Sequence, residues 1–194
     1  MSKNMNNFEI LRLNKPNITD FSLERNILMG ESKSDWVLFL DTDEEISKEL
    51  DQELKNLDTT GYSGFCIKRK IIFLGEEIGE DKVVRLGKKD AGKWHRAVHE
   101  TWNIKGKVGT LKSYIIHNTA ENLQEYVEKM NKYSTLHAME NKKEGKRSTL
   151  LKIIIFPKLK LLQNLFLGRG FTFSMLQSFH SFLGWTKLWE LQKK

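Results

Sequence analysis

The stretch DWVLFLDTDEE, residues 35–45, decides the fold of this chain. Its five consecutive apolar residues, 36–40, have the length of a strand and predict one that is buried on both faces of a parallel sheet. Four acidic side chains follow within the next five positions, and crowded carboxylates repel one another unless a positive charge compensates them. A buried strand with polar ligands at its carboxyl end is typical of α/β proteins, in which ligands bind at that edge.

The segments on either side of this strand predict helices. Residues 17–34 have an apolar helical face and are expected to end near Gly30, while residues 47–57 are expected to form a second helix after an N-cap at Ser47. The N-cap of the first helix is expected at one of three residues, Asn17, Thr19 or Asp20. Helix, buried strand and helix in this order predict an α/β organisation.

The remainder of the chain changes from strands to helices. Gly-containing turns separate three predicted strands, at 62–73, 82–86 and 108–117. Apolar residues at helical spacing then predict a helix at 120–143 and two more, 150–167 and 171–191, on either side of the turn GRG. We therefore expect three regions: an α/β core at 1–119, a connecting helix at 120–144 and a helical tail at 145–194.

Positive charge is concentrated in that tail. Residues 145–194 hold nine Lys or Arg and one acid, Glu190, whereas the whole chain has a net charge of +7. Apolar and aromatic residues lie among these basic ones, a combination that predicts helices lying in the interface of an anionic membrane. Packing against the core or against a second chain is the alternative. Binding of nucleic acid is the least favoured, because the long apolar residues would need burial.

Three further features bear on the compartment. Residues 1–10 lack the apolar segment of a secretory signal, and no run reaches the roughly 18 apolar residues of a membrane span. The single cysteine, Cys66, lies in an apolar stretch and is expected to be a buried thiol in a reducing compartment. We expect a cytoplasmic protein.

Asp41 and Asp43 are the first candidate ligands. Alternate residues of an extended segment face the same way, so the two carboxylates can converge on one cation. Such oxygen ligands suit Mg²⁺ or Mn²⁺, which would bring a diphosphate with it. A calcium loop is a poorer match, because the sixth position is not Gly and a strand precedes it. The alternative is a solvated acidic turn that caps the next helix.

Motifs along nearly the whole chain resemble a known family. FSLERNILMGESKSDWVLFLDTDEEIS resembles the central segment of family 2 glycosyltransferases. The motifs GFCIKRKIIFLGEEI, VVRL, WHRAVHE, IIHNT and TKLWEL, in this order, are similar to a bacterial subgroup that includes lipopolysaccharide-core glycosyltransferases. The resemblance implies a partial GT-A fold, that of nucleotide-diphospho-sugar transferases, followed by amphipathic helices.

The resemblance also implies an activity: inverting, metal-assisted transfer of a sugar from a nucleotide-sugar donor to a glycan or a lipid-linked acceptor. Asp41 and Asp43 match the family's metal and diphosphate site, and Glu100 matches its general base, a role for which Glu44 or Glu45 is the alternative. His117 matches a further metal or phosphate contact. The enzyme is expected to be peripheral to the inner face of the cytoplasmic membrane.

Other candidates follow from the same motifs. Arg85 is expected to neutralise phosphate or to pair with Asp81. Three residues are expected at the acceptor site: Trp94, His95 and His99. Trp94 could equally be a core residue, and His99 could simply be hydrogen-bonded to Glu100.

One part of the family pattern has no counterpart here. Only 40 residues precede Asp41, fewer than the family's nucleotide-gripping βαβ unit needs, and residues 1–15 can supply at most one strand. We therefore expect an N-terminally incomplete enzyme whose activity in isolation is open. The alternative function is a non-catalytic remnant that binds a membrane or a partner.

Overall fold

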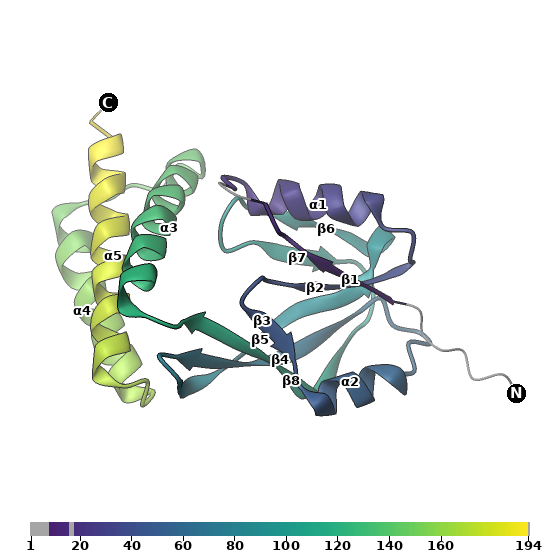
Figure 1. The fold of residues 1–194 in the computed structure, drawn as a ribbon. Coiled ribbons are helices and arrows are strands. Elements are labelled where there is room, and N and C mark those ends of the chain that lie inside the picture. Colours follow the sequence, from purple (N-terminus) through teal and green to yellow (C-terminus); the bar gives the residue numbers. More distant parts are fainter. Residues whose placement is uncertain (1–7, 16–17, 194) are drawn as a thin grey trace, which may run out of the picture. The chain divides into compact units, whose positions relative to one another are not determined.

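A computed structural model describes residues 8–15 and 18–193, which form two compact units. The first unit comprises the chain up to 71 and residues 80–118; the second comprises 72–79 and 119–194. The elements in the first part of the chain are β1 Phe8–Arg12, α1 Phe21–Glu31, β2 Trp36–Leu40, β3 Glu44–Ile46, α2 Lys48–Lys55, β4 Gly64–Phe73, β5 Glu76–Lys88, the 3-10 turn η1 Lys89–Ala91, β6 Gly92–His95, β7 Thr101–Ile104 and β8 Val108–Ala120. The helices α3 Leu123–Lys143, α4 Leu150–Phe166 and α5 Phe171–Leu191 follow (Figure 1).

A six-stranded mixed sheet has the order β1-β2-β5-β4-β8-β3, and β6 and β7 form a separate two-stranded sheet. The predicted strand β2 lies between β1, to which it is parallel, and β5, to which it is antiparallel, so the expected parallel sheet is wrong and the sheet is mixed. Short β3 pairs with the edge of β8, so that Glu44 lies opposite His117. The residues that follow β2 therefore turn directly into another strand of the same sheet.

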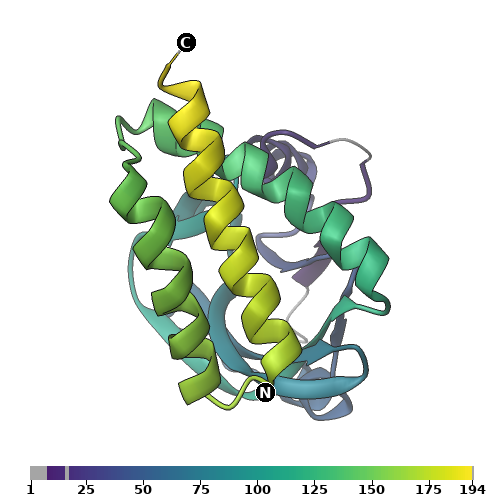
Figure 2. The ribbon, with the colours of Figure 1, turned by 90° about the vertical axis from the view of Figure 1, so that its left-hand side faces the viewer.

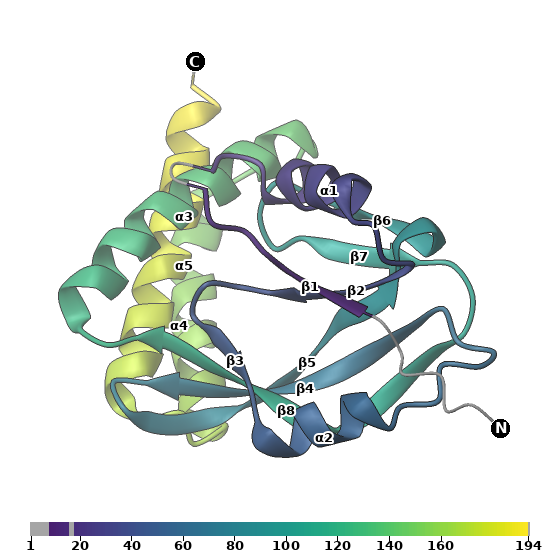
Figure 3. The same ribbon diagram turned by 45° about the vertical axis from the view of Figure 1, so that its right-hand side comes forward.

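Both faces of β2 are buried, as predicted, because its alternate side chains enter two different cores. Leu38 and Leu40 belong to a cluster that includes Leu50 and Leu54 of α2. Val37 and Phe39 belong to a second cluster, which includes Met29 of α1, Trp94 of β6 and Trp102 of β7. Figure 3 shows α1 with β6 and β7 on one side of the sheet and α2 on the other.

The helix caps agree with the sequence where they can be compared. Asp20 caps α1 by accepting a hydrogen bond from the Leu23 N–H, and Ser47 caps α2 through the Leu50 N–H. Asn17, another of the three N-cap candidates for α1, lies outside the described residues. One expectation was wrong: Cys66 of β4 is only partly buried.

In the second unit, α5 packs against both α3 and α4 (Figure 2). Polar contacts join these helices: the Lys187 ammonium donates to the Asn131 carbonyl oxygen at 2.7 Å, and the Ser178 hydroxyl donates to that of Pro157 at 2.8 Å. Within residues 18–193, no helix has both the length and the apolar character needed to cross a bilayer. The three helices predicted in this part of the chain are all present, and α5 packs against each of the other two.

Candidate functional site: carboxylates paired with buried arginines

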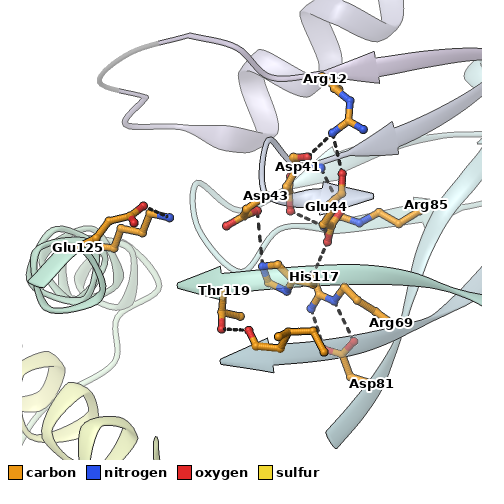
Figure 4. A network of polar contacts seen from close by, with 12 residues as sticks. Arg12, Asp41, Asp43, Glu44, Arg69, Asp81, Arg85, His117, Thr119 and Glu125 are labelled. Atoms are coloured by element: carbon orange, nitrogen blue, oxygen red, sulfur yellow. Dashed lines mark hydrogen bonds and ion pairs between the residues drawn. The ribbon is translucent and has the colours of Figure 1, made fainter. Parts of the chain in front are cut away.

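The acidic stretch after β2 forms a tight turn. The Asp41 N–H donates to a Glu44 side-chain oxygen at 2.9 Å, and the Glu44 N–H donates to the Asp41 carbonyl oxygen at 3.1 Å. Arg12, at the end of β1, donates to the carbonyl oxygens of Asp41 at 2.7 Å and of Glu44 at 2.8 Å (Figure 4). Because β1 and β2 are parallel, their carboxyl ends lie together, and this brings Arg12 to the turn.

The Asp41 carboxylate is held by two arginines. Arg25 donates to its Oδ1, and the Arg85 Nη2 donates to its Oδ2 at 2.6 Å. Burial raises the pKa of Asp41, but the charges of Arg85 and Arg25 lower that pKa by more, so the carboxyl group is held ionised. The positive charge that the acidic stretch requires is thus supplied, at Asp41, by the protein itself.

Arg25 extends the network to Glu100, in the loop between β6 and β7. Its Nε and Nη2 donate to Glu100 Oε1 at 3.1 and 2.9 Å. The Arg25 side chain is 1% exposed, compared with 28% for Asp41 and 16% for Glu100. One buried cation therefore joins two carboxylates that are both reachable from solvent.

A second group of contacts buries Glu44 completely. Arg69 and Arg85 donate to its Oε1 at 2.8 and 3.1 Å, and its side chain is 0% exposed. Arg69 also holds Asp81, at 3.0 and 2.7 Å. The expected pairing of Arg85 with Asp81 is therefore wrong: the Asp81 carboxylate pairs with Arg69, and Arg85 pairs with Asp41 and Glu44. A sealed Glu44 is also a poor candidate for a general base.

Asp43 and His117 lie at the other side of the turn. The Asp43 Oδ1 is 3.6 Å from the His117 Nε2, and the Asn118 N–H donates to the Asp43 carbonyl oxygen at 2.9 Å. The His117 Nδ1 is buried and has no hydrogen-bond partner among the residues that the structure describes. This pairing follows from the register of β3 with β8 (Figure 4).

The geometry bears on the expected metal in two ways. Within residues 8–15 and 18–193, no group of three His, Cys, Asp or Glu side chains gathers as a metal site. Both Asp41 oxygens accept hydrogen bonds from arginines, so Asp41 does not fit as a ligand in this arrangement; the other two predicted ligands, Asp43 and His117, lie together, 3.6 Å apart. Mg²⁺ or Mn²⁺ binding stays a prediction, and a bound diphosphate would have to supply further oxygens.

The three residues predicted at the acceptor site differ in exposure. Trp94 is a core residue, stacked on Trp102 at 5.4 Å and edge-on to Phe39 at 5.1 Å, which is the alternative that the sequence left open. His95 and His99 are exposed, and His99 has a positive φ of 54° directly before Glu100. Contact of His95 and His99 with an acceptor stays a prediction.

A hollow of about 330 Å³ lies at the same edge of the sheet. Its exposed lining residues are Arg12, Asn14, Thr42 and Glu45, and the fully buried Glu44 adjoins it. It therefore opens between the end of β1 and the acidic turn.

The roles of Arg12, Arg25 and Arg69 were not predicted. For Arg25 a signal was present: Ser22, Arg25 and Met29 follow one another at helical spacing and form the buried face of α1. A lone charged residue on a core-facing stripe needs a buried partner, so its position pointed to an internal carboxylate.

Comparisons with known proteins point to one class. The chain is 26% identical over 187 residues to uncharacterised glycosyltransferases of Rickettsia typhi and Rickettsia prowazekii, covering 83% of this chain and 64% of theirs. It is 25% identical over 184 residues to the lipopolysaccharide core biosynthesis glycosyltransferase LpsC of Rhizobium meliloti, covering 86% and 68%. No protein-family model matches the chain.

The chain is therefore a distant relative of bacterial glycosyltransferases, and it spans somewhat less than two thirds of the length of the rickettsial ones.

Proposed function

We propose that this chain carries the carboxylate site of an inverting glycosyltransferase. Such an enzyme would transfer a sugar from a nucleotide-sugar donor to a glycan or lipid-linked acceptor of the bacterial cell envelope. The observation that carries the proposal is the pair Asp41 and Glu100, brought together by Arg25 at the carboxyl end of β2. The similarity to bacterial glycosyltransferases, LpsC among them, supports the reaction class.

Glu100 is proposed as the general base. The acceptor hydroxyl oxygen would form a bond to the anomeric carbon while the bond from that carbon to the leaving phosphate oxygen breaks. The hydroxyl proton would go to Glu100, and the electron pair would leave with the nucleoside diphosphate. Glu100 is 16% exposed, so a hydroxyl can reach it, whereas the alternative base Glu44 is sealed.

The departing diphosphate needs cationic donors. Arg85 Nε and Nη1 and Arg25 Nη1 are buried and have no hydrogen-bond partner within residues 8–15 and 18–193. Arginine is well suited to phosphate because its planar guanidinium presents several donors in a fixed geometry. We propose Arg85 as a phosphate contact, with Asp43 and His117 as the side chains that would hold Mg²⁺ or Mn²⁺; such a cation would neutralise phosphate charge.

The test is Glu100→Gln in the whole chain, with exposed Glu49→Gln of α2 as the matched control. Activity is measured as nucleoside diphosphate released from UDP-, GDP- and dTDP-sugars in the presence of truncated lipopolysaccharide. Since glutamine cannot accept the proton, turnover should fall by about 10² to 10⁴ in Glu100→Gln and remain unchanged in the control. Normal turnover in Glu100→Gln would place the base elsewhere. Absence of turnover in the wild type would favour the non-catalytic alternative.

We also propose that α4 and α5 attach the protein to an anionic membrane, which would present a lipid-linked acceptor. Apolar side chains are exposed along α4, with Leu151 at 69%, Leu162 at 62% and Phe166 at 93%. On α5 the exposed apolar residues are Phe171, Met175, Phe179 and Phe182. Residues 145–189 contain no acid, so the charge beside these side chains is basic and matches anionic lipid.

Vesicle flotation tests the attachment. The double variant Leu159→Gln/Leu162→Gln removes two exposed apolar side chains of α4, and Leu123→Gln changes a comparably exposed leucine of α3. We expect the wild type and Leu123→Gln to float with phosphatidylglycerol vesicles at low salt and the double variant to float much less. Equal flotation of all three, or of none, would contradict the proposal.

A further inference from the structure

Arg25 is more deeply buried than Arg69 and Arg85, the other arginines that bind carboxylates of the candidate site. It binds the carboxylates of Asp41 and Glu100, and its Cζ lies 4.7 Å from the ring centroid of Trp94 and 5.6 Å from that of Phe39. Burial lowers the pKa of Arg25, but the charges of Asp41 and Glu100 raise it by more. A cation this deep is stable only while its carboxylate partners remain ionised and correctly placed.

The main chain fixes where Arg25 lies. The neighbouring residue Asn26 donates from its side chain to the Trp94 carbonyl oxygen at 3.0 Å and accepts from the Trp94 N–H at 3.0 Å. At the start of the helix, the Phe21 N–H donates to the Ala97 carbonyl oxygen at 2.9 Å. Three hydrogen bonds thus join α1 to the segment 94–97, which leads directly into Glu100.

The contacts leave one side of Glu100 available. Arg25 binds Oε1 twice, and none of the hydrogen bonds found within the described residues involves Oε2. Two hydrogen bonds to one oxygen fix the position of Oε1, while the other oxygen can accept a proton. The same guanidinium contacts Asp41 Oδ1, so the two carboxylates cannot move independently.

We infer that Arg25, anchored through Asn26, is a positioning residue. It places the Glu100 carboxylate for proton acceptance and fixes its position relative to the Asp41 carboxylate. This inference rests on the proposed function for the role of Glu100 in transfer. The coupling between Arg25 and Glu100 is a separate physical claim, and it can be measured without turnover.

The first measurement is the carboxyl signal of Glu100 at pH 7 in the ¹³C NMR spectrum of protein with labelled glutamates, assigned by its loss in Glu100→Gln. Because Arg25 donates twice to Glu100 Oε1, this signal should move in Arg25→Met, which lacks both the donors and the charge, and by less in Arg25→Lys, which keeps the charge. An unchanged Glu100 signal in folded Arg25→Met would overturn the inference.

A second measurement serves if Arg25→Met does not fold. Glu100→Gln keeps Arg25 and its contact to Asp41, and it changes a side chain that is partly exposed. Exchange of the Arg25 Nε–H with water, followed by ¹⁵N NMR, should be slow in the wild type and at least about tenfold faster in Glu100→Gln, since a neutral amide is the weaker acceptor. Equal exchange rates would overturn the inference.

Activity then separates the two claims. If the wild type turns over, the acidic limb of its pH–rate profile should move upward in Arg25→Lys or Arg25→Met, whereas a general loss of stability would lower turnover without moving that limb. Asn26→Ala should lower kcat and leave the limb in place, because the charge is retained. A profile that does not move in Arg25→Met would reject the positioning role. Absence of wild-type turnover would reject the proposed function and leave the NMR results to decide the coupling.

Discussion

The sharpest test of the arginine–carboxylate network is Asp41→Asn, which keeps the shape of the side chain and removes its charge. Arg25 and Arg85 would each lose one ion pair and keep one carboxylate, Glu100 and Glu44 respectively. Removing one partner of a buried pair costs about 3–5 kcal/mol. Because Asp41 is 28% exposed, we expect the lower end, a loss of about 3 kcal/mol in the free energy of unfolding at pH 7.

The same variant tests the pH dependence. The pKa of Asp41 is lowered in the folded protein, so this group stabilises the fold above its unfolded pKa of about 3.9 and loses that effect as pH falls toward the folded pKa. The difference in stability between the wild type and Asp41→Asn should therefore be full at pH 7 and shrink as the pH falls below about 5.

Urea unfolding followed by tryptophan fluorescence measures both effects. Asp51→Asn is the matched control, because Asp51 pairs with Lys55 at 2.5 Å across one helical turn and both side chains are well exposed. Exposed pairs of this kind contribute about 0.5 kcal/mol or less. If Asp41→Asn costs no more than Asp51→Asn, or if its cost does not change with pH, the reasoning about Arg25 and Arg85 is refuted.

Two further outcomes test the metal site and the packing. Calorimetry with Mn²⁺ and UDP should show a heat of binding in the wild type, and this heat should be lost when EDTA is added and in Asp43→Ala. An equal heat of binding in Asp43→Ala would exclude the pair Asp43 and His117 as a metal site. A methyl group on Gly87 would lie 2.6 Å from Ile104 Cδ1 and 2.9 Å from a Trp102 ring carbon, so Gly87→Ala should destabilise the fold by about 1–3 kcal/mol, and unchanged thermal unfolding would contradict this packing.

The long elements could be predicted from the sequence because each carries its own local signal. The apolar run of β2 and the Ser47 cap of α2 are examples. The short strands β3, β6 and β7 were not predicted. Each has only three or four residues, too few for a clear pattern, and their strand geometry comes from pairing, of β3 with distant β8 and of β6 with β7.

The candidate site was predictable in its carboxylates and in Arg85, but not in Arg25. Asp41 follows a visible strand, and Glu100 stands in a motif that resembles a known family. Arg25 and Glu100 are 75 residues apart, and only the docking of α1 on β6 brings them together. The sequence suggested a metal as the compensating charge for the acidic stretch, and the described side chains supply arginines at Asp41 instead.

The contacts of Arg12 decide which positions of the acidic turn, residues 41–44, can be substituted without a change in its conformation. Among the residues that the structure describes, it donates to two main-chain carbonyl oxygens, those of Asp41 and Glu44, and the return bond from the Glu44 N–H to the Asp41 carbonyl oxygen is also between main-chain atoms. The path of the turn is thus held partly by bonds between main-chain atoms and Arg12, which persist when side chains of the turn change, and partly by the bond from the Asp41 N–H to the Glu44 carboxylate, which does not. Thr42 and Asp43, whose side chains take no part in these bonds, are therefore the positions at which the chemistry that the turn presents could be altered while Arg12 and Glu44 preserve the loop conformation.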